Sequence, residues 1–250
     1  MSRGEYPATR MRRNRMKAFS RRLVAENSIS TDDLIWPLFV IEGTNCAEAI
    51  ASMPGVNRWS IDRLIDQAGL ALSLGIPAIA IFPSIDPAQK DAAGSLARDG
   101  NNLVCRAVAA VKSAHPDLGI ICDVALDPFT DHGHDGVLNK DGLVDNDKTV
   151  DILCQGALIA AGSGFDIVAP SDMMDGRIGK IRKSLDKNGY HMTQILSYAV
   201  KYASSFYGPF REAVGSKGLL KGNKKNYQMD FRNSTEALRE VGLGSGKANV

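Results

Sequence analysis

The chain has 250 residues, of which 44% are hydrophobic and 23% charged, a composition typical of a soluble globular protein with one sizeable core. Its formal net charge of +2 is too small to favour nucleic acid as a general partner. Because no apolar run approaches the ~18 residues of a membrane span and the N-terminus lacks a secretory signal, we expect a cytoplasmic protein without membrane partners.

The N-terminal segment is locally basic. Its first 22 residues hold eight arginines or lysines and one glutamate. Such a segment is compatible with a nucleic-acid or membrane tail, a transit peptide or a solvated terminus. We therefore separate residues 1–33, as an arm and lead-in, from a predicted catalytic domain over residues 34–250.

Apolar runs rich in β-branched residues alternate with helical patterns along the rest of the chain, which predicts βα units around a parallel sheet. Helical spacing of apolar residues begins after Ser60, and Gly75 follows its end. The expected strands are 35–41, 77–82, 119–124, 166–169 and 194–200. The expected helices are 61–72, 103–111, 150–161 and 178–185.

These strand spacings fit either a doubly wound sheet or a (β/α)8 barrel. A doubly wound nucleotide-binding sheet usually carries a glycine-rich turn after its first strand, and no GxGxxG sequence is present there. Neither glycine-lysine segment, 218–222 or 244–247, has the spacing of a phosphate-binding loop. We therefore predict an α/β fold of the TIM-barrel type, with catalytic groups at the carboxyl ends of the strands.

Lys201 ends the fifth expected strand among small and aromatic residues. Alternation places Ser197 and Ala199 on the same face as Lys201. We expect burial and the neighbouring cation Arg211 to favour the neutral amine, which can attack a ketone and form a Schiff base. The alternative is a lysine that marks the solvent end of a strand.

Two further polar segments are candidate sites. Carboxylates and histidines between Asp123 and Asp135 could bind a hard cation or form a solvated loop. Arg211 precedes the basic segment Gly215–Lys225, and Lys224 lies in it. Cations there could hold a substrate carboxylate, or the segment could simply be a basic surface loop.

Seven segments of the chain match motifs of one known enzyme family, in that family's order. They are residues 12–15 (RRNR), 52–55 (SMPG), 123–130 (DVALDPFT), 132–136 (HGHDG), 169–178 (APSDMMDGRI), 197–211 (SYAVKYASSFYGPFR) and 227–230 (YQMD). From about Arg10 to Glu240 the chain therefore resembles the porphobilinogen synthase (delta-aminolevulinic acid dehydratase) family. The resemblance implies a TIM barrel and the condensation of two 5-aminolevulinate molecules to porphobilinogen.

The resemblance also implies roles for single residues. Lys201 matches the lysine that holds one substrate as a Schiff base, and Asp127 and Asp135 could orient or deprotonate an amino group. Segment Gly215–Lys225 matches the lid of the active site. The positions that match substrate-binding residues are Ser171, Tyr207, Phe210, Arg211, Lys224 and Gln228.

Metal use and assembly are also implied by the resemblance. Ala125, Asp127 and Asp135 stand where zinc-dependent members have three cysteines, so we expect no catalytic zinc. Glu240 matches a ligand of an allosteric Mg²⁺ in magnesium-responsive members. The N-terminal arm matches one that wraps a neighbouring subunit, which implies a homo-oligomer, an octamer in the full-length form.

The C-terminal sequence departs from the family pattern. A sixth strand with a second lysine, in a Met-Val-Lys-Pro-Gly type motif, is expected after Glu240, but the chain continues with a glycine-rich tail. Lys247 lies in that tail and is not assigned the second lysine's role. We therefore expect a truncated member with about five of eight strands. The alternatives are a class I aldolase-like lyase, which needs one lysine, and a non-catalytic remnant that binds substrate or oligomerises.

Overall fold

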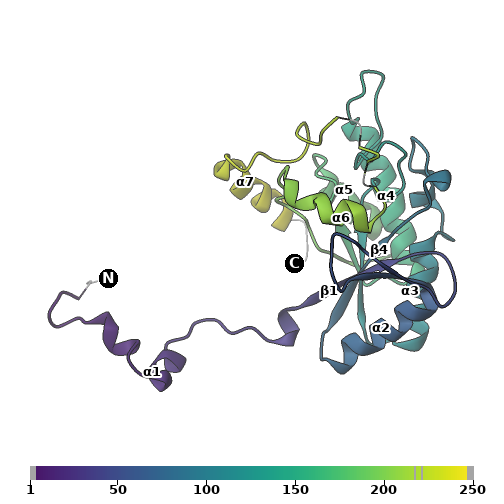
Figure 1. The fold of residues 1–250 in the computed structure, drawn as a ribbon. Coiled ribbons are helices and arrows are strands. Elements are labelled where there is room, and N and C mark those ends of the chain that lie inside the picture. The colour runs from purple at the N-terminus through teal and green to yellow at the C-terminus, as the bar shows by residue number, and fades with distance from the viewer. Residues whose placement is uncertain (1–3, 217, 221, 247–250) are drawn as a thin grey trace.

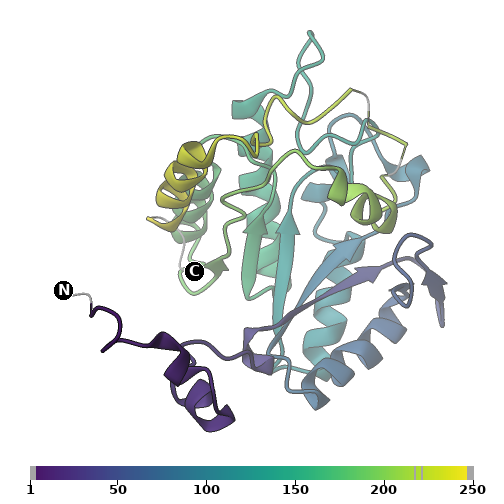
Figure 2. The ribbon, with the colours of Figure 1, turned by 60° about the vertical axis from the view of Figure 1, so that its left-hand side comes forward.

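The structure is a computed structural model, and it describes residues 4–216, 218–220 and 222–246. A seven-stranded sheet forms its centre, and helices cover the sheet (Figures 1 and 2). The strands are β1 (Ile35–Val40), β2 (Ala47–Ala49), β3 (Asn57–Trp59), β4 (Ala78–Pro83), β5 (Gly119–Val124), β6 (Ile167–Pro170) and β7 (Gln194–Ile195). The α-helices are α1 (Ala18–Leu23), α2 (Ile61–Ser73), α3 (Leu103–Ala114), α4 (Asn146–Ser163), α5 (Arg177–Lys187), α6 (Gly208–Ala213) and α7 (Ser234–Ser245).

The strand order is β2-β3-β1-β4-β5-β6-β7, and every pair except β2 with β3 is parallel. The ladder from β1 through β4 to β7 therefore follows chain order without a reversal. A doubly wound sheet reverses its order at a switch point, whereas successive βα units of a barrel do not. The order agrees with the predicted barrel type, and the four predicted helices correspond to α2, α3, α4 and α5.

The two faces of the sheet bury different cores. The outer face packs α2 to α5 against alternate strand residues such as Ile79, Ile81 and Ile120. The inner face buries Phe39 and Phe82, and α6 packs on this side, with Phe210 in contact with both rings. Parallel strands buried on both faces read as continuous apolar runs, which is why they were visible in the sequence.

Helix ends follow local capping chemistry. Asn102 Oδ1 accepts a hydrogen bond from Cys105 N at 2.9 Å and begins α3, while Gly164 at φ 108° ends α4. Helix α2 begins after Ser60 as expected. The Ser60 hydroxyl, however, accepts from Cys46 N at 2.9 Å and does not cap the helix.

The fifth predicted strand is shorter than expected, because only Gln194–Ile195 forms regular strand. The backbone continues along β6 through single hydrogen bonds from Leu196 N to Val168 O at 3.0 Å and from Tyr198 N to Pro170 O at 3.3 Å. The Arg177 guanidinium donates to Tyr198 O at 3.0 Å and takes the place of a strand partner there. Lys201 therefore follows an extended but irregular segment.

The N-terminal arm leads away from the sheet, as the purple segment of Figure 1 shows. Almost all described side chains before β1 are exposed, including the apolar Phe19, Leu23 and Ile29. Its separation from the catalytic domain stays a prediction. The four cysteines carry free thiols, three of them buried and Cys46 half-buried. Among the described helices, none combines the length and the apolar character needed to cross a membrane.

Candidate active site

Lys201 lies on the carboxyl-end side of the sheet, with 11% of its side chain exposed. Its Nζ donates a hydrogen bond to Ser171 O at 2.6 Å, and Ser171 directly follows β6. The ring centroid of Tyr207 is 5.6 Å from the same nitrogen. The ends of two neighbouring strands and the segment before α6 therefore place three predicted site residues together.

The loop after β5 brings a pair of carboxylates to this lysine. Asp135 is fully buried, and its Oδ1 is 3.8 Å from Lys201 Nζ. Lys224 Nζ donates to the same oxygen at 3.1 Å and is 3.5 Å from Asp127 Oδ2. Two ammonium groups from different segments therefore share one carboxylate oxygen. The site is a buried ion cluster and not a solvated loop.

This cluster corrects the expected charge of Lys201. Burial alone lowers the pKa of Lys201, but Asp135, Asp127 and Asp123 raise it, and their effect is larger. The resting side chain is therefore an ammonium, and the expectation of a neutral amine is wrong. The cation that approaches Asp135 beside Lys201 is Lys224, whereas Arg211 makes no ion pair with any described residue.

The carboxylates differ in their affinity for a proton. Burial raises the pKa of Asp123 to about 7 and also raises the pKa of Asp127, against the opposing effect of Lys224 on Asp127. Burial acts in the same direction on Asp135, but Lys201 and Lys224 hold its pKa below the ordinary range. The cluster thus contains an ionised carboxylate beside groups that bind a proton more readily.

Within the cluster around Lys201, two buried carboxylate oxygens have no hydrogen-bond partner among the described residues. They are Asp135 Oδ2 and Asp123 Oδ1. A buried acceptor without a donor is costly, so a site that holds such acceptors suits a ligand that brings N–H groups. An amino group or an ammonium has this chemistry.

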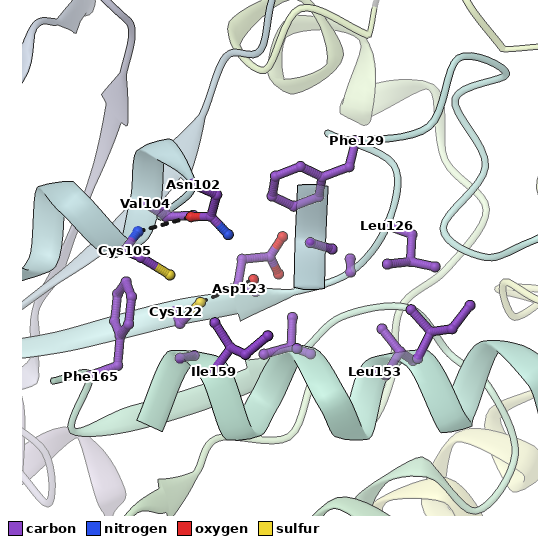
Figure 3. A pocket seen from close by; sticks show the side chains of 16 residues that line it. Asn102, Val104, Cys105, Cys122, Asp123, Leu126, Phe129, Leu153, Ile159 and Phe165 are labelled. Carbon is purple, nitrogen blue, oxygen red and sulfur yellow. Dashed lines mark hydrogen bonds between the residues drawn. The ribbon is translucent and has the colours of Figure 1, made fainter. Parts of the chain in front are cut away.

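Several cavities adjoin residues of the site, and one of them is lined by Asp123. A cavity of about 610 Å³ opens beside Tyr207 and is lined by residues 200, 202–207 and 231. Figure 3 shows a different cavity, of about 30 Å³, between β5 and α4, where Cys105, Cys122 and Phe165 form apolar walls. The second holds at most about two waters and is too small for an organic substrate.

The remaining predicted residues lie at different distances from this chemistry. Phe210 lies in the inner core, with its ring centroid 5.1 Å from that of Phe82. Gln228 is buried, and its Oε1 lacks a partner among the described residues. Gln228 and Glu240 line another cavity, of about 410 Å³. Lys217 and Lys221 of the predicted lid, and Lys247, lie outside the described residues.

Sequence reasoning gave no role to two residues of the site. Tyr227 accepts a hydrogen bond from Asp135 N at 3.3 Å, and its hydroxyl is 3.1 Å from His134 Nδ1. Lys90 is buried beside Asp127, whose charge raises the pKa of Lys90 against burial. Tyr227 stood in the matched YQMD segment, but nothing in the local sequence of Lys90 predicted burial.

Comparisons with known proteins identify the family. The model of the delta-aminolevulinic acid dehydratase family matches residues 8–247. The chain belongs to this family. A relative of that name from Bradyrhizobium diazoefficiens is 56% identical over 236 residues, which are 94% of this chain and 67% of the relative. Another from Chlamydia pneumoniae is 49% identical, over 94% of this chain and 70% of the relative.

A solved structure of a family member carries the same fold. It is delta-aminolevulinic acid dehydratase (porphobilinogen synthase) from Toxoplasma gondii in complex with the reaction product porphobilinogen, with a TM-score of 0.92 and 45% identity. The match covers 96% of this chain and 68% of that chain. It confirms the α/β fold of the barrel type. Family membership also decides against the class I aldolase alternative.

Proposed function

We propose that the protein condenses two molecules of 5-aminolevulinate to porphobilinogen, the first building block of tetrapyrroles, with loss of two waters. Two findings support this function. The family model covers residues 8–247, and the Toxoplasma relative was solved with that product. A buried lysine at a strand end, beside acceptors suited to an amino group, is the chemistry that such a condensation needs.

Lys201 carries the covalent step in this proposal. Its amine attacks the ketone carbon of 5-aminolevulinate, and the resulting carbinolamine loses water to form an imine. The imine withdraws electrons and acidifies the adjacent carbon, so that the carbon can lose a proton and form a carbon–carbon bond. The hydrogen bond from Lys201 Nζ to Ser171 O at 2.6 Å orients the nitrogen before attack.

Proton transfer falls to the surrounding carboxylates. Lys201 must lose a proton before it can attack, and burial raises the pKa of Asp123 to about 7, which makes Asp123 a suitable acceptor near neutral pH. Asp127 and Asp135 orient the amino group of a substrate, because Asp135 Oδ2 is a buried acceptor without a donor among the described residues. Arg211, Lys224 and Gln228 hold a substrate carboxylate in this proposal.

The imine is tested directly by chemical capture. Incubation with 5-aminolevulinate and borohydride, followed by peptide mass mapping, should place the reduced adduct on Lys201, and Lys201→Met should abolish it. The matched control is Lys187→Met, which removes an exposed lysine at the end of α5. An adduct elsewhere, with Lys201 unmodified, contradicts the assignment. A colorimetric pyrrole assay then tests turnover by the 250-residue chain, and binding without turnover would favour the remnant alternative.

For metals, we propose an allosteric Mg²⁺ near Glu240 and no catalytic zinc. Zinc favours thiolates, whereas Asp127 and Asp135 offer carboxylate oxygens, and the ammonium of Lys224 already pairs with one oxygen of each. Glu240 lines its cavity with Asp175 and Glu236, and such oxygen donors fit a hard cation. Within the described ranges no three His, Cys, Asp or Glu side chains form a metal-binding group, so water would complete the shell. A Mg²⁺ response lost in Glu240→Gln would support this.

We also propose a cytoplasmic homo-octamer assembled through the N-terminal arm. The exposed apolar side chains of Phe19, Leu23 and Ile29 support the proposal, because exposed apolar side chains that gather on one segment can mark a surface for a protein partner. Sedimentation analysis of the chain, compared with a variant that has Phe19, Leu23 and Ile29 replaced by serine, tests it. The variant should dissociate to smaller species.

A further inference from the structure

Lys90 is a buried cation to which neither the sequence nor the family resemblance gave a role. It follows β4 and a short 3-10 helix, Pro87–Gln89, and it is 8% exposed. Lys90 and Lys224 are the two most deeply buried lysines of the described residues; Lys224 is paired with Asp127 and Asp135, and Lys90 interacts electrostatically with Asp127. Lysine is almost never buried without a partner, so its location requires an explanation.

The direct partner of Lys90 is a backbone carbonyl. Its Nζ donates to Gly215 O at 3.2 Å, and no carboxylate of the described residues lies within ion-pair distance. Gly215 begins the segment that returns to the carboxylates at Lys224. A φ of +66° and a Cβ position only 3.0 Å from Ser84 Oγ make any residue other than glycine strained at this place. The contact therefore joins the loop after β4 to the first residue of this segment.

The backbone around Lys90 is fixed to the aspartate loop. Asp91 N donates to Phe129 O at 3.3 Å, and Asp131 N donates back to Asp91 O at 3.2 Å. A ring nitrogen of His132 lies 3.3 Å from Ala92 O. These contacts consequently fix the backbone next to Lys90 relative to the loop that carries Asp127.

The charge of Lys90 acts on Asp127. The two groups interact electrostatically, and the interaction opposes the fall in the pKa of Lys90 that burial causes. The other charged groups that face Asp127 are Lys224, Lys201, Asp135 and Asp123. Lys224 forms ion pairs with the carboxylate pair, whereas Lys90 holds the backbone of Gly215.

We propose that Lys90 is a positioning residue for the active site, which fixes Gly215 through its carbonyl and stabilises the ionised form of Asp127. The residue does not touch the reacting atoms. Loss of its charge would raise the pKa of Asp127, because a cation favours the carboxylate. Loss of its hydrogen bond would free the Gly215 carbonyl. The inference rests on the proposed function only where substrate capture is measured.

The first measurement does not depend on activity. Hydrogen–deuterium exchange of the peptide over residues 208–216 should be faster in Lys90→Met than in the wild type and in Lys187→Met, because Gly215 loses its anchor. Equal exchange in all three proteins would overturn the anchoring part. Lys90→Arg keeps a donor and should restore slow exchange, which distinguishes anchoring from a general loss of packing.

The second measurement separates charge from structure. The half-saturating concentration of 5-aminolevulinate for borohydride capture should rise as the pH is lowered. The midpoint of this rise should lie about 0.5 to 1 pH unit higher in Lys90→Met than in the wild type. Lys90→Arg should keep the wild-type midpoint. The keto acid 4-oxopentanoate lacks the amino group and should show no such shift. A midpoint unchanged in Lys90→Met, or equal shifts with both ligands, would overturn the charge part. If the wild type captures neither ligand, the proposed function fails, and the exchange measurement still decides the role of Lys90.

Discussion

Asp135 holds Lys201 in its charged form, so Asp135→Asn should make Lys201 a better nucleophile at neutral pH. The Asp135 Oδ1 to Lys201 Nζ distance is 3.8 Å, and both side chains are buried. At an effective dielectric constant of about 20, two charges at this separation attract by about 4 kcal/mol. This corresponds to at most about 3 pKa units, since one unit is about 1.36 kcal/mol.

The expected shift is smaller than this limit. The amide of asparagine keeps a dipole near Lys201, and Asp127 and Asp123 continue to raise its pKa. We expect the pKa of Lys201 to fall by about 1 to 2 units, which increases the neutral fraction at pH 7 by about 10- to 100-fold. Removal of Asp135 also leaves Lys224 with Asp127 as its ion-pair partner, so thermal unfolding must be measured beside reactivity.

The assay uses 4-oxopentanoate, which lacks the amino group that Asp135 would bind. The rate of borohydride capture on Lys201 is measured against pH, and the midpoint should move to lower pH by about 1 to 2 units in Asp135→Asn. Asp131→Asn, an exposed carboxylate of the same loop, is the control and should leave the midpoint unchanged. An unchanged or higher midpoint in a folded Asp135→Asn protein would refute the electrostatic reasoning.

Three further predictions follow from neighbouring contacts. Lys224→Met removes a cation from Asp135, so the pKa of Lys201 should rise and capture of 4-oxopentanoate at pH 7 should slow, measured by the same assay. Burial raises the pKa of Asp123 to about 7, so between about pH 4 and 7 the folded protein keeps a proton that the unfolded chain has lost. The free energy of unfolding should therefore fall as the pH rises through this range. In denaturant titrations, Asp123→Asn should reduce this fall by a few kcal/mol. Arg177→Met leaves the buried Asp172 unpaired and should destabilise the protein by about 3 to 5 kcal/mol, unlike Lys187→Met.

The helices and most strands could be predicted because their apolar residues repeat at the period of a buried face. The antiparallel pair β2 and β3 could not, since Ala47–Ala49 is exposed and too short for a pattern. The end of β7 was predicted too far along the chain. Alternation continues to Lys201, but hydrogen bonding there depends on Arg177, a residue of another element.

The residues of the site were easier to predict than their charges. Lys201 and Arg211 are near each other in sequence, which suggested a cation that would favour the neutral amine. The structure places Asp123, Asp127 and Asp135 around Lys201 because parallel strands bring their carboxyl ends together. Charges that meet only through the fold are not visible in the local sequence, and this also explains why Lys90 was missed.

The charged resting state of Lys201 has a consequence for which ketones react. The negative charges of Asp127 and Asp135 hold the proton on Lys201, and a ligand ammonium that binds them offsets these charges. The pKa of Lys201 should therefore fall when such a ligand binds. At pH 7, a ketone that carries an amino group would then react faster with Lys201 than a ketone of similar size without one. Capture of 5-aminolevulinate should therefore exceed that of 4-oxopentanoate in the wild type, and Asp135→Asn should narrow the difference, because the charge to be offset is smaller. Equal rates for the two ligands in the wild type would contradict this argument, since both carry the same ketone and carboxylate and differ only in the group that the two aspartates bind.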